Sequence, residues 1–474
     1  MPKFIADFHI HSKYSMATSK QLTPKWLDYW SRIKGISVMG TGDFTHPKWL
    51  AELQEQLEPA EQGLFTLKPE FREVADWVPQ GKTRFMLTAE ISSIYKKGGK
   101  TRKVHNILWA PSFELAQKVQ DEFIRRGFNI KSDGRPIIGL DSRDLLELVL
   151  AISEDIKLVP AHIWTPWFSA LGAKSGFDSI EECYGDLEPY IFAVETGLSS
   201  DAPMNWMCSS LDKYALLSNS DAHSPEKLGR NANIFNCEMS FNGIVQALKD
   251  KKSKTFIGTI DTYPQAGKYH YSGHRKCEVC STPDEVLAHK FLCPTCKKPY
   301  TLGVMDRVAQ LADRADISSC YARQSIDYII SLPELLSHIH GVSETSKKIK
   351  TLYPTIIKEL GTEFGILTEI SISDIAQKTD GFIAEGIRRM REGEIIVSEG
   401  FDGEYGEIQV FTKEELESYK TNSSFVPKKN KIKKAKRELF DLEKYKELAK
   451  TTDFSILLGK KPDGQLQLFN LNSI

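Results

Sequence analysis

Histidines and carboxylates that could bind metal ions recur along the first half of the chain, beginning with His9 and His11. In an extended strand, residues two positions apart point to the same side, so both imidazoles can reach one ion. A lone His-x-His pair is weak evidence, because two histidines on one strand are often ordinary surface residues. The pair gains meaning because residues of the same kind accompany later apolar runs.

The later candidates each lie beside or within a short apolar run, mostly at its end. They are Asp43 and His46 after VMGTG, Glu90 after FMLTA, His105 at the start of VHNILW, His162 after KLVPA, Glu195 after IFAV, and Asp221 and His223 after YALLSNS. Imidazole and carboxylate groups together suit zinc or manganese. Close ions repel one another, so they need a bridging carboxylate, and Glu90 is our candidate for that bridge.

Such a metal cluster predicts hydrolysis of a phosphate ester. Bound divalent ions (Zn2+, Mn2+ or Mg2+) can lower the pKa of a water molecule and orient its attack on phosphorus. They can also stabilise the attacking and the leaving oxygens. The pattern therefore indicates a metal-dependent phosphoesterase with two or three catalytic ions.

The elements that must position these residues follow from the hydrophobic pattern. Seven short apolar runs are expected to form strands, at 4–8, 36–39, 85–87, 107–109, 158–159, 191–194 and 214–217. Helical patterns lie between several of them, for example at 24–34 and 141–153. This alternation indicates a mostly parallel α/β sheet or barrel, and the strand count favours a (βα)7 barrel. In a barrel, catalytic groups gather at the carboxyl ends of the strands.

The chain has 474 residues, which is too long for one compact domain. We expect a catalytic barrel over 1–262, a small metal-binding module over 263–302, a mainly helical C-terminal domain over 303–411 and a charged tail or linker over 412–474. Within the helical domain, apolar spacing predicts helices through Val308 and Leu311, through Ile326, Ile329 and Ile330, through Leu335, Leu336 and Ile339, and over 383–391. Two short strands at 394–398 and 406–411 are expected beside GFDGEYG.

Four of the eight cysteines have a spacing typical of a zinc module. Two residues separate Cys277 from Cys280 and Cys293 from Cys296, and twelve residues lie between the pairs. Four thiolates fill a tetrahedral site and leave no open position for a substrate. The spacing therefore predicts one structural Zn2+ held by these four cysteines.

The overall charge limits how the chain could bind nucleic acid. With a formal net charge of −1, any DNA contact must come from local basic patches. One candidate is the segment 428–437, with seven basic residues, which is either a solvated linker or helix face or a strip that contacts phosphates. The apolar runs are too short to span a membrane and the N-terminus lacks a signal-peptide pattern, so we expect a cytoplasmic protein.

The motifs HIHSKYS, TGDFTH, PAHIW and SDAH, with the glutamate after the third strand, resemble the polymerase-and-histidinol-phosphatase (PHP) family. That family has a distorted seven-stranded βα barrel and a trinuclear metal site. The resemblance implies one metal at His9, His11, Glu90 and Asp221, which are also the expected catalytic residues, a second at Glu90, His105 and His162, and a third at His46 and His223. Many members carry an aspartate ligand where this chain has Met16, and Asp43 is the candidate to replace it.

A narrower resemblance covers nearly the whole chain. GTGDFTHPKWL, AHIWTPWFSALGAKSGFDSIEEC, ETGLSSDAPMNW, SNSDAHSP, the cysteine pairs and GFDGEYG are similar to the endonuclease Q family. That family joins a PHP barrel to a zinc module and a further C-terminal region. The resemblance implies a DNA repair endonuclease that nicks 5′ to deaminated bases (uracil, hypoxanthine or xanthine) or abasic sites.

An enzyme that inspects a base must take it out of the stack, so aromatic and small polar residues near the metals are candidate base contacts. These candidates are Trp164 and Trp167, which follow His162, and Gly197, Ser199, Ser200 and Asn205 in ETGLSSDAPMNW. The aromatic residues could equally belong to the core. Deaminated bases carry a carbonyl in place of an amine, and N–H donors and small hydroxyls would suit that carbonyl.

Other readings stay open at this point. A PHP-type small-molecule phosphatase similar to histidinol phosphatase would need neither the zinc module nor the long C-terminal region. A non-catalytic DNA-binding accessory domain is favoured only by Met16. The final residues, QLQLFNLNSI, resemble the approach to the glutamine motif of superfamily 1 helicases. The chain is therefore either a full-length protein with an ordinary terminus or the N-terminal part of a nuclease–helicase fusion.

Overall fold

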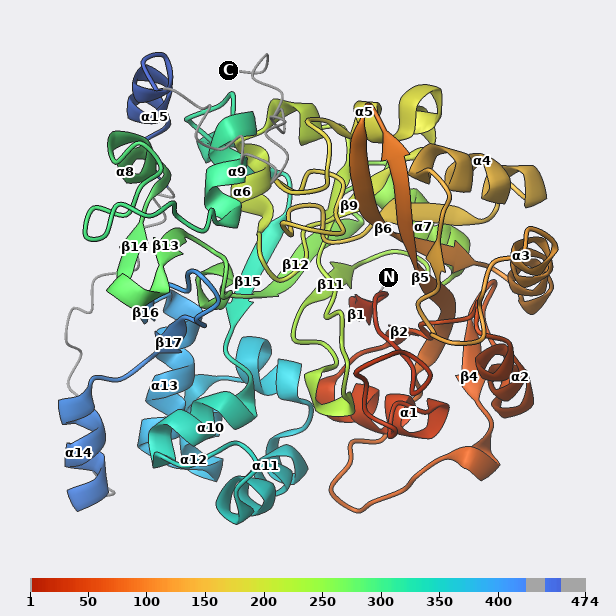
Figure 1. The fold of residues 1–474 in the computed structure, drawn as a ribbon. Helices are drawn as coiled ribbons and strands as arrows, with labels where there is room; N and C mark the ends of the chain where they lie inside the picture. Colours follow the sequence, from red (N-terminus) through yellow and green to blue (C-terminus); the bar gives the residue numbers. More distant parts are fainter. Residues whose placement is uncertain (1, 423–439, 453–474) are drawn as a thin grey trace.

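The computed structural model describes residues 2–422 and 440–452 and is organised around one large mixed sheet (Figure 1). The path through this sheet runs β15 (Ser325–Ile329), β12 (Phe256–Thr262), β11 (Ala232–Phe235), β1 (Phe4–Asp7), β2 (Val38–Gly40), β5 (Arg84–Lys97), β4 (Phe65–Leu67) and β3 (Leu57–Pro59). Off this path, β6 (Lys100–Ala110) and β7 (Ile137–Ile138) pair with β5, and β8 (Lys157–Pro160) pairs with β6. β9 (Ala193–Glu195) and β10 (Ala215–Leu217) form a separate parallel pair.

Each of the seven apolar runs overlaps a strand, but the expectation of a mostly parallel sheet is wrong. β1, β2 and β5 are parallel neighbours, whereas β5 and β6 form a long antiparallel hairpin and β11 runs antiparallel to both β1 and β12. The hairpin turns at Gly98 and Gly99, whose φ angles are 59° and 73°. Two successive positive φ angles suit a tight hairpin turn, and glycine adopts them without steric cost.

Helices pack around the sheet, and both N-terminal helix predictions are confirmed by α1 (Pro24–Lys34) and α4 (Ser142–Ile152). α1 begins with a proline at its first position and ends at Gly35, which has a φ of 91°. α4 begins at Asp141, whose side chain accepts a hydrogen bond from the Arg143 N–H. The other helices of this region are α2 (Pro47–Gln56), α3 (Phe113–Arg125), α5 (Ile180–Tyr184), α6 (Ala202–Trp206) and α7 (Phe241–Lys249).

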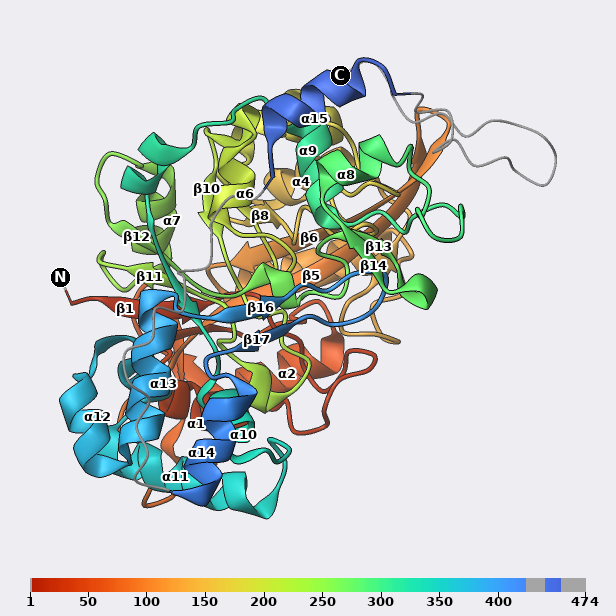
Figure 2. The ribbon, with the colours of Figure 1, turned by 90° about the vertical axis from the view of Figure 1, so that its left-hand side faces the viewer.

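The C-terminal region is mainly helical. Its helices are α8 (Pro283–Ala288), α9 (Val304–Leu311), α10 (Leu332–His340), α11 (Lys347–Leu360), α12 (Ile372–Lys378), α13 (Gly381–Glu392), α14 (Lys413–Thr421) and α15 (Leu442–Ala449). α10 to α14 gather at the lower left of Figure 1, and α15 lies over α8 and α9 in Figure 2. The expected strands beside GFDGEYG are present as β16 (Ile396–Ser398) and β17 (Glu407–Gln409), an antiparallel hairpin.

The helix predicted through Ile326, Ile329 and Ile330 is wrong, because this segment forms β15. β15 pairs in parallel with β12, so the C-terminal region adds a strand to the central sheet. The segment SIDYII contains both a helical and an alternating spacing of apolar residues, and short apolar runs do not distinguish the two. Pairing with β12, which local sequence does not encode, therefore decides that this segment is a strand.

A buried ion pair joins α1 to the C-terminal helices. The Lys34 Nζ lies 2.7 Å from the Glu363 Oε2, with side chains 5% and 2% exposed. The same carboxylate accepts hydrogen bonds from the Leu332 N–H at 3.1 Å and from the Tyr353 hydroxyl. Glu363 therefore links the first helix of the chain to α10 and α11.

No helix in the described ranges is long and apolar enough to cross a membrane. The predicted basic strip at 428–437 and the terminal segment QLQLFNLNSI lie outside the described residues.

We expect Glu363→Gln to lower the free energy of unfolding by about 3–5 kcal/mol, because it leaves the Lys34 charge buried without its partner. Denaturant unfolding measures this change. The control is Glu369→Gln, at an ion pair with Lys3 in which the glutamate is 59% exposed; its cost should stay below about 1 kcal/mol. If both variants lowered the free energy of unfolding by the same small amount, this role of Glu363 would be contradicted.

Candidate functional site

Seven of the predicted metal ligands come together in three overlapping groups. The groups are His9, His11 and Glu90; His11, Asp221 and His223; and Glu90, His105 and His162. Within each group the potential ligand atoms lie within 4.8 Å of one another. His11 and Glu90 each belong to two groups, so the seven residues form one continuous set, which we call the donor cluster.

His9 has the surroundings expected of a metal ligand. Its Nδ1 lies 3.0 Å from each oxygen of the Glu195 carboxylate. Its Nε2 is buried and has no hydrogen-bond partner among the described residues. Histidines that bind metals commonly give their other ring N–H to a carboxylate. The unpartnered Nε2 therefore fits a metal ion, with Glu195 fixing the ring.

Packing on the other side of the strand holds His9 in place. The neighbouring Phe8 is fully buried, with its ring centroid 4.8 Å from that of Trp109 and 5.9 Å from that of Phe235. Side chains alternate along an extended segment, so burying Phe8 in this aromatic core directs His9 to the opposite side. The hydrophobic core thus orients the first predicted metal ligand.

Glu90 lies at the centre of the donor cluster. Its Oε1 is 2.6 Å from the His105 Nδ1 and 3.0 Å from the His162 Nε2. Its Oε2 is 3.4 Å from the His11 Nε2. Burial opposes ionisation of this carboxyl, but the imidazoles of His105 and His9 outweigh it and hold the pKa of Glu90 well below its usual value. Glu90 is thus an anion with a different set of histidines at each oxygen.

The predicted ligands do not all lie at strand ends. His162 follows β8, Glu195 ends β9 and Asp221 follows β10, as expected. Glu90 and His105, in contrast, lie inside the long strands β5 and β6. The antiparallel hairpin therefore carries its ligands on its face.

Three residues at the site have unusual backbone conformations. The φ angles of Asp43, His162 and Asp221 are 50°, 26° and 47°. Residues other than glycine rarely occupy this left-handed region, and such strain persists where surrounding structure fixes it, often at functional sites. Three of the non-glycine residues with positive φ are thus predicted ligands.

Asp43 supports the donor cluster from its edge. Its Oδ1 lies 3.3 Å from the His11 Nδ1, and its Oδ2 accepts hydrogen bonds from the Ser12 N–H at 2.7 Å and the Ser15 hydroxyl at 2.8 Å. Asp43 is not in the three groups. Its contacts resemble those of Glu195, since each carboxylate holds the second ring nitrogen of a donor histidine.

The structure does not bring His46 to His223. The His46 Nε2 lies 3.1 Å from the Lys131 carbonyl oxygen, outside the donor cluster. His223 instead groups with His11 and Asp221. Met16, which replaces the aspartate of many PHP proteins, is 68% exposed. The resemblance implied a third metal at His46 and His223, whereas the structure groups His223 with His11 and Asp221.

The predicted zinc module brings together three of its four predicted cysteine ligands and a histidine. Donor atoms of His274, Cys277, Cys293 and Cys296 lie within 4.8 Å of one another. Cys280 lies outside this group. Three thiolates and one imidazole are a common ligand set for a structural zinc ion.

The hairpin formed by β13 (Ser272–His274) and β14 (Val279–Ser281) explains this arrangement. His274 pairs with Val279, and Gly273 pairs with Cys280. Directly paired residues share a face of the hairpin and neighbouring residues alternate, so Cys280 and His274 point to opposite faces. The signal for His274 in the sequence is its position three residues before Cys277.

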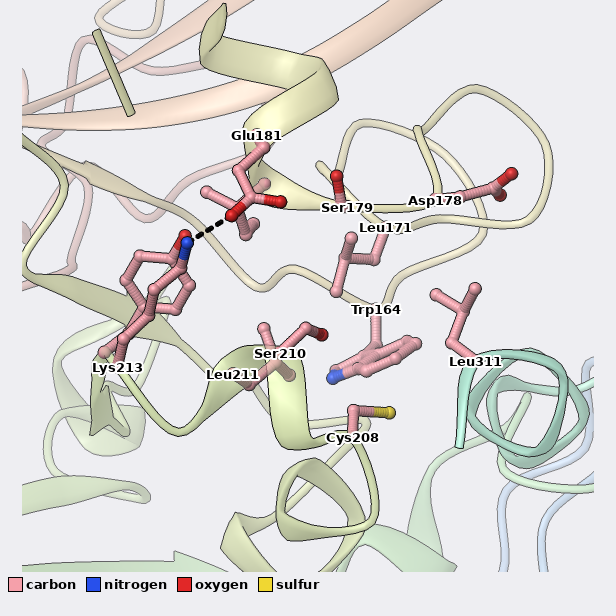
Figure 3. Close-up of a pocket in the computed structure, with 12 residues that line it drawn as sticks. Trp164, Leu171, Asp178, Ser179, Glu181, Cys208, Ser210, Leu211, Lys213 and Leu311 are labelled. Atoms are coloured by element: carbon pink, nitrogen blue, oxygen red, sulfur yellow. Dashed lines mark hydrogen bonds and ion pairs between the residues drawn. The ribbon is translucent and has the colours of Figure 1, made fainter. Parts of the chain in front are cut away.

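Two of the predicted base-contact residues are buried together. Figure 3 shows Trp164 in a small pocket with Leu171, Cys208 and Leu311 nearby. Its indole N–H donates to the Asn205 Oδ1 at 2.8 Å, and both residues are at most 1% exposed. Trp164 and Asn205 are therefore part of the buried interior and not of an exposed base-contact surface.

The remaining base-contact candidates differ in exposure. Ser200 is buried, and its hydroxyl donates to the Thr196 carbonyl oxygen at 2.9 Å. A Cβ on Gly197 would lie 2.5 Å from the Cβ of His162, so this glycine permits close packing beside the donor cluster. Ser199 is half-buried, and Trp167 is 47% exposed.

Sequence reasoning missed Arg135. Its guanidinium Nη1 lies 3.2 Å from the Glu90 Oε2. It lies in an irregular segment between α3 and β7 that has no apolar period, so no pattern marked it.

Comparison with known proteins adds two solved structures of high similarity. The lesion-specific endonuclease Q from Pyrococcus furiosus is 29% identical, with a TM-score of 0.75 over 88% of this chain and 99% of that one. A complex of endonuclease Q with a 27-mer duplex that carries an abasic lesion at the active site is 30% identical, with a TM-score of 0.72 over 87% and 98% of the chains.

Sequence relatives extend this comparison. YqxK of Bacillus subtilis is 28% identical over 86% of this chain and all of its own length. MJ0043 of Methanocaldococcus jannaschii is 33% identical over 60% of this chain, but the match spans only 36% of that protein. A family model described as the MJ0043 C-terminal domain matches residues 331–394.

We predict that the zinc module binds its ion through His274 and not through Cys280. His274→Ala should lose about one equivalent of tightly bound zinc, because metal binding and folding of such a module are coupled. Cys280→Ser, the matched control, should keep it. In the Co2+-loaded protein, the thiolate-to-metal absorption should be unchanged by Cys280→Ser. The four-cysteine site would be correct instead if Cys280→Ser reduced that absorption and His274→Ala left the metal affinity unchanged.

Proposed function

The chain belongs to the endonuclease Q family, and on that premise we propose that it is a metal-dependent DNA repair endonuclease. We propose nicking of the phosphodiester 5′ to deaminated bases (uracil, hypoxanthine or xanthine) or abasic sites, with the damaged nucleotide flipped out of the helix. The observation that carries this proposal is the donor cluster, and above all the buried, unpartnered His9 Nε2.

The residues of the donor cluster fit two or three divalent ions. When bound, such ions supply an activated water and offset the negative charge that develops on the phosphate. His9, His11, Glu90 and Asp221 would hold the first ion, and Glu90, His105 and His162 the second. His223 with His11 and Asp221 offers a third set of donors. Zn2+ in the cysteine module would be structural.

The chain's own residues prepare the site for hydrolysis. Glu195 fixes His9 through its Nδ1 and also accepts a hydrogen bond from the His162 N–H at 2.7 Å. Asp43 fixes His11 in the same way. Hydrolysis forms one P–O bond from water and breaks the P–O3′ bond, and a proton from water ends on the released 3′ oxygen. Rigid donors favour this reaction because little reorganisation is needed.

A flipped base would contact the exposed part of the segment around the cluster. Trp167 is the exposed aromatic residue that follows His162, and a base could stack on its ring. Ser199 and the backbone beside Gly197 could meet the carbonyl of a deaminated base. Trp164, Ser200 and Asn205 would support this surface from behind.

We also propose that the chain consists of a distorted PHP barrel over 1–262, a zinc module over 263–302, a mainly helical C-terminal domain over 303–411 and a charged tail or linker over 412–474. A cytoplasmic location suits the eight free cysteines. A fused or associated superfamily 1 helicase remains a prediction.

The test is a nicking assay on duplexes with one uracil, one hypoxanthine, one abasic site or no lesion. We expect cleavage 5′ to each lesion, a 3′-hydroxyl product and complete inhibition by EDTA. His9→Ala should reduce the rate by at least about 100-fold, since loss of a ligand should exceed the cost of losing its outer-sphere partner. His340→Ala, on α10 away from the donor cluster, should retain full activity.

Cleavage that persists in EDTA would contradict metal dependence. Hydrolysis of a small phosphate ester such as histidinol phosphate, without any nicking of damaged DNA, would favour the phosphatase instead.

A further inference from the structure

Arg135 is a cation placed against the central carboxylate of the donor cluster. Its Nη1 lies 3.2 Å from the Glu90 Oε2, and its side chain is 29% exposed while that of Glu90 is fully buried. The guanidinium therefore reaches from the solvent side to the centre of the site.

The segment that carries Arg135 is held on both sides. The Gly134 N–H donates to the Tyr14 carbonyl oxygen at 3.0 Å, and the Pro136 carbonyl oxygen accepts from the Ser92 N–H at 3.0 Å. A Cβ on Gly134 would lie 2.3 Å from the Asp43 Oδ2, so only glycine fits this close approach. These contacts fix the backbone of Arg135 beside the donor cluster.

Asp133 adds a further anchor. Its Oδ1 accepts hydrogen bonds from the backbone N–H groups of Arg135 and Met16, each at 3.1 Å. The segment that contains Met16 is thus tied to the segment that contains Arg135.

The guanidinium has donors to spare. Within the described residues its side chain makes one hydrogen bond, to Glu90, and a guanidinium carries five N–H donors. An arginine guanidinium stays protonated at physiological pH, so the side chain is charged. A charged guanidinium with free N–H donors can bind a phosphate group through two parallel hydrogen bonds.

The partly exposed side chains show where a phosphate can approach. Asp221 and His223 have side chains 27% and 36% exposed, close to the 29% of Arg135. His9 and His11 are at most 1% exposed. Arg135, Asp221 and His223 therefore form the accessible side of the cluster.

We propose that Arg135 is a catalytic residue that binds a non-bridging oxygen of the scissile phosphate. This role rests on the proposed hydrolysis of a phosphodiester. As the P–O bond to water forms and the P–O3′ bond breaks, negative charge develops on the non-bridging oxygens. The guanidinium stabilises that charge while its hydrogen bond to Glu90 holds it in position. No other described arginine or lysine side chain pairs with a carboxylate of the cluster.

The test compares Arg135→Gln, Arg135→Lys and a control, Arg125→Gln, whose arginine is 69% exposed on α3. On a duplex with one uracil, kcat should fall about 10²–10³-fold in Arg135→Gln, as when one transition-state donor is removed. In Arg135→Lys, kcat should fall less, because lysine keeps the positive charge but lacks the paired N–H donors of the guanidinium. The metal content of all three variants, measured by mass spectrometry, should equal that of the wild type.

A second readout is independent of DNA cleavage. Binding of inorganic phosphate to the metal-loaded protein, measured by calorimetry, should weaken about tenfold or more in Arg135→Gln and stay unchanged in Arg125→Gln. If the wild type nicks no damaged DNA, the proposed function fails and phosphate binding alone decides the role of Arg135. The proposal would be overturned if Arg135→Gln kept the wild-type kcat and phosphate affinity. It would also be overturned if the loss of activity in Arg135→Gln were fully explained by a matching loss of bound metal. If Arg135→Gln does not fold, the same comparisons apply to Arg135→Lys.

Discussion

The buried negative charge of Glu90 is the constraint on which the site depends. An isolated carboxylate is costly to bury, and it persists only where cations or donors surround it. In this chain four histidines and Arg135 meet Glu90 on β5, and they come from β6, the segments that follow β1 and β8, and the segment before β7. Elements far apart in sequence are thereby held around one carboxylate, which is the arrangement that several close metal ions also require.

Outer carboxylates continue this organisation. Glu195 holds His9 and Asp43 holds His11, each through the Nδ1 that faces away from the centre. Next to His9 in the sequence, Phe8 is packed in the aromatic core, which fixes the backbone that carries His9. The site is therefore preorganised by packing on one side and by hydrogen bonds on the other, which suits a reaction that needs fixed positive charge.

The sequence predicted much of the site and less of the fold. His9, Glu90, His162 and Asp221 were recognisable because apolar strands precede them and their types recur. The hairpin of β5 and β6 and the strand β15 were misjudged, since pairing partners and direction depend on tertiary contacts that local spacing does not encode. Cys280 lies outside the cysteine module's donor group because strand alternation turns it away, and the CxxC spacing alone does not report which face a residue occupies.

The central claim is that Glu90 joins the metal sites into one unit. Counting bound metals by mass spectrometry in the wild type, in Glu90→Gln and in a control, Glu188→Gln, tests it most directly. The account predicts that Glu90→Gln loses the catalytic metals together and keeps the single zinc of the cysteine module, while Glu188→Gln matches the wild type. A Glu90→Gln protein with the full metal complement would contradict the account.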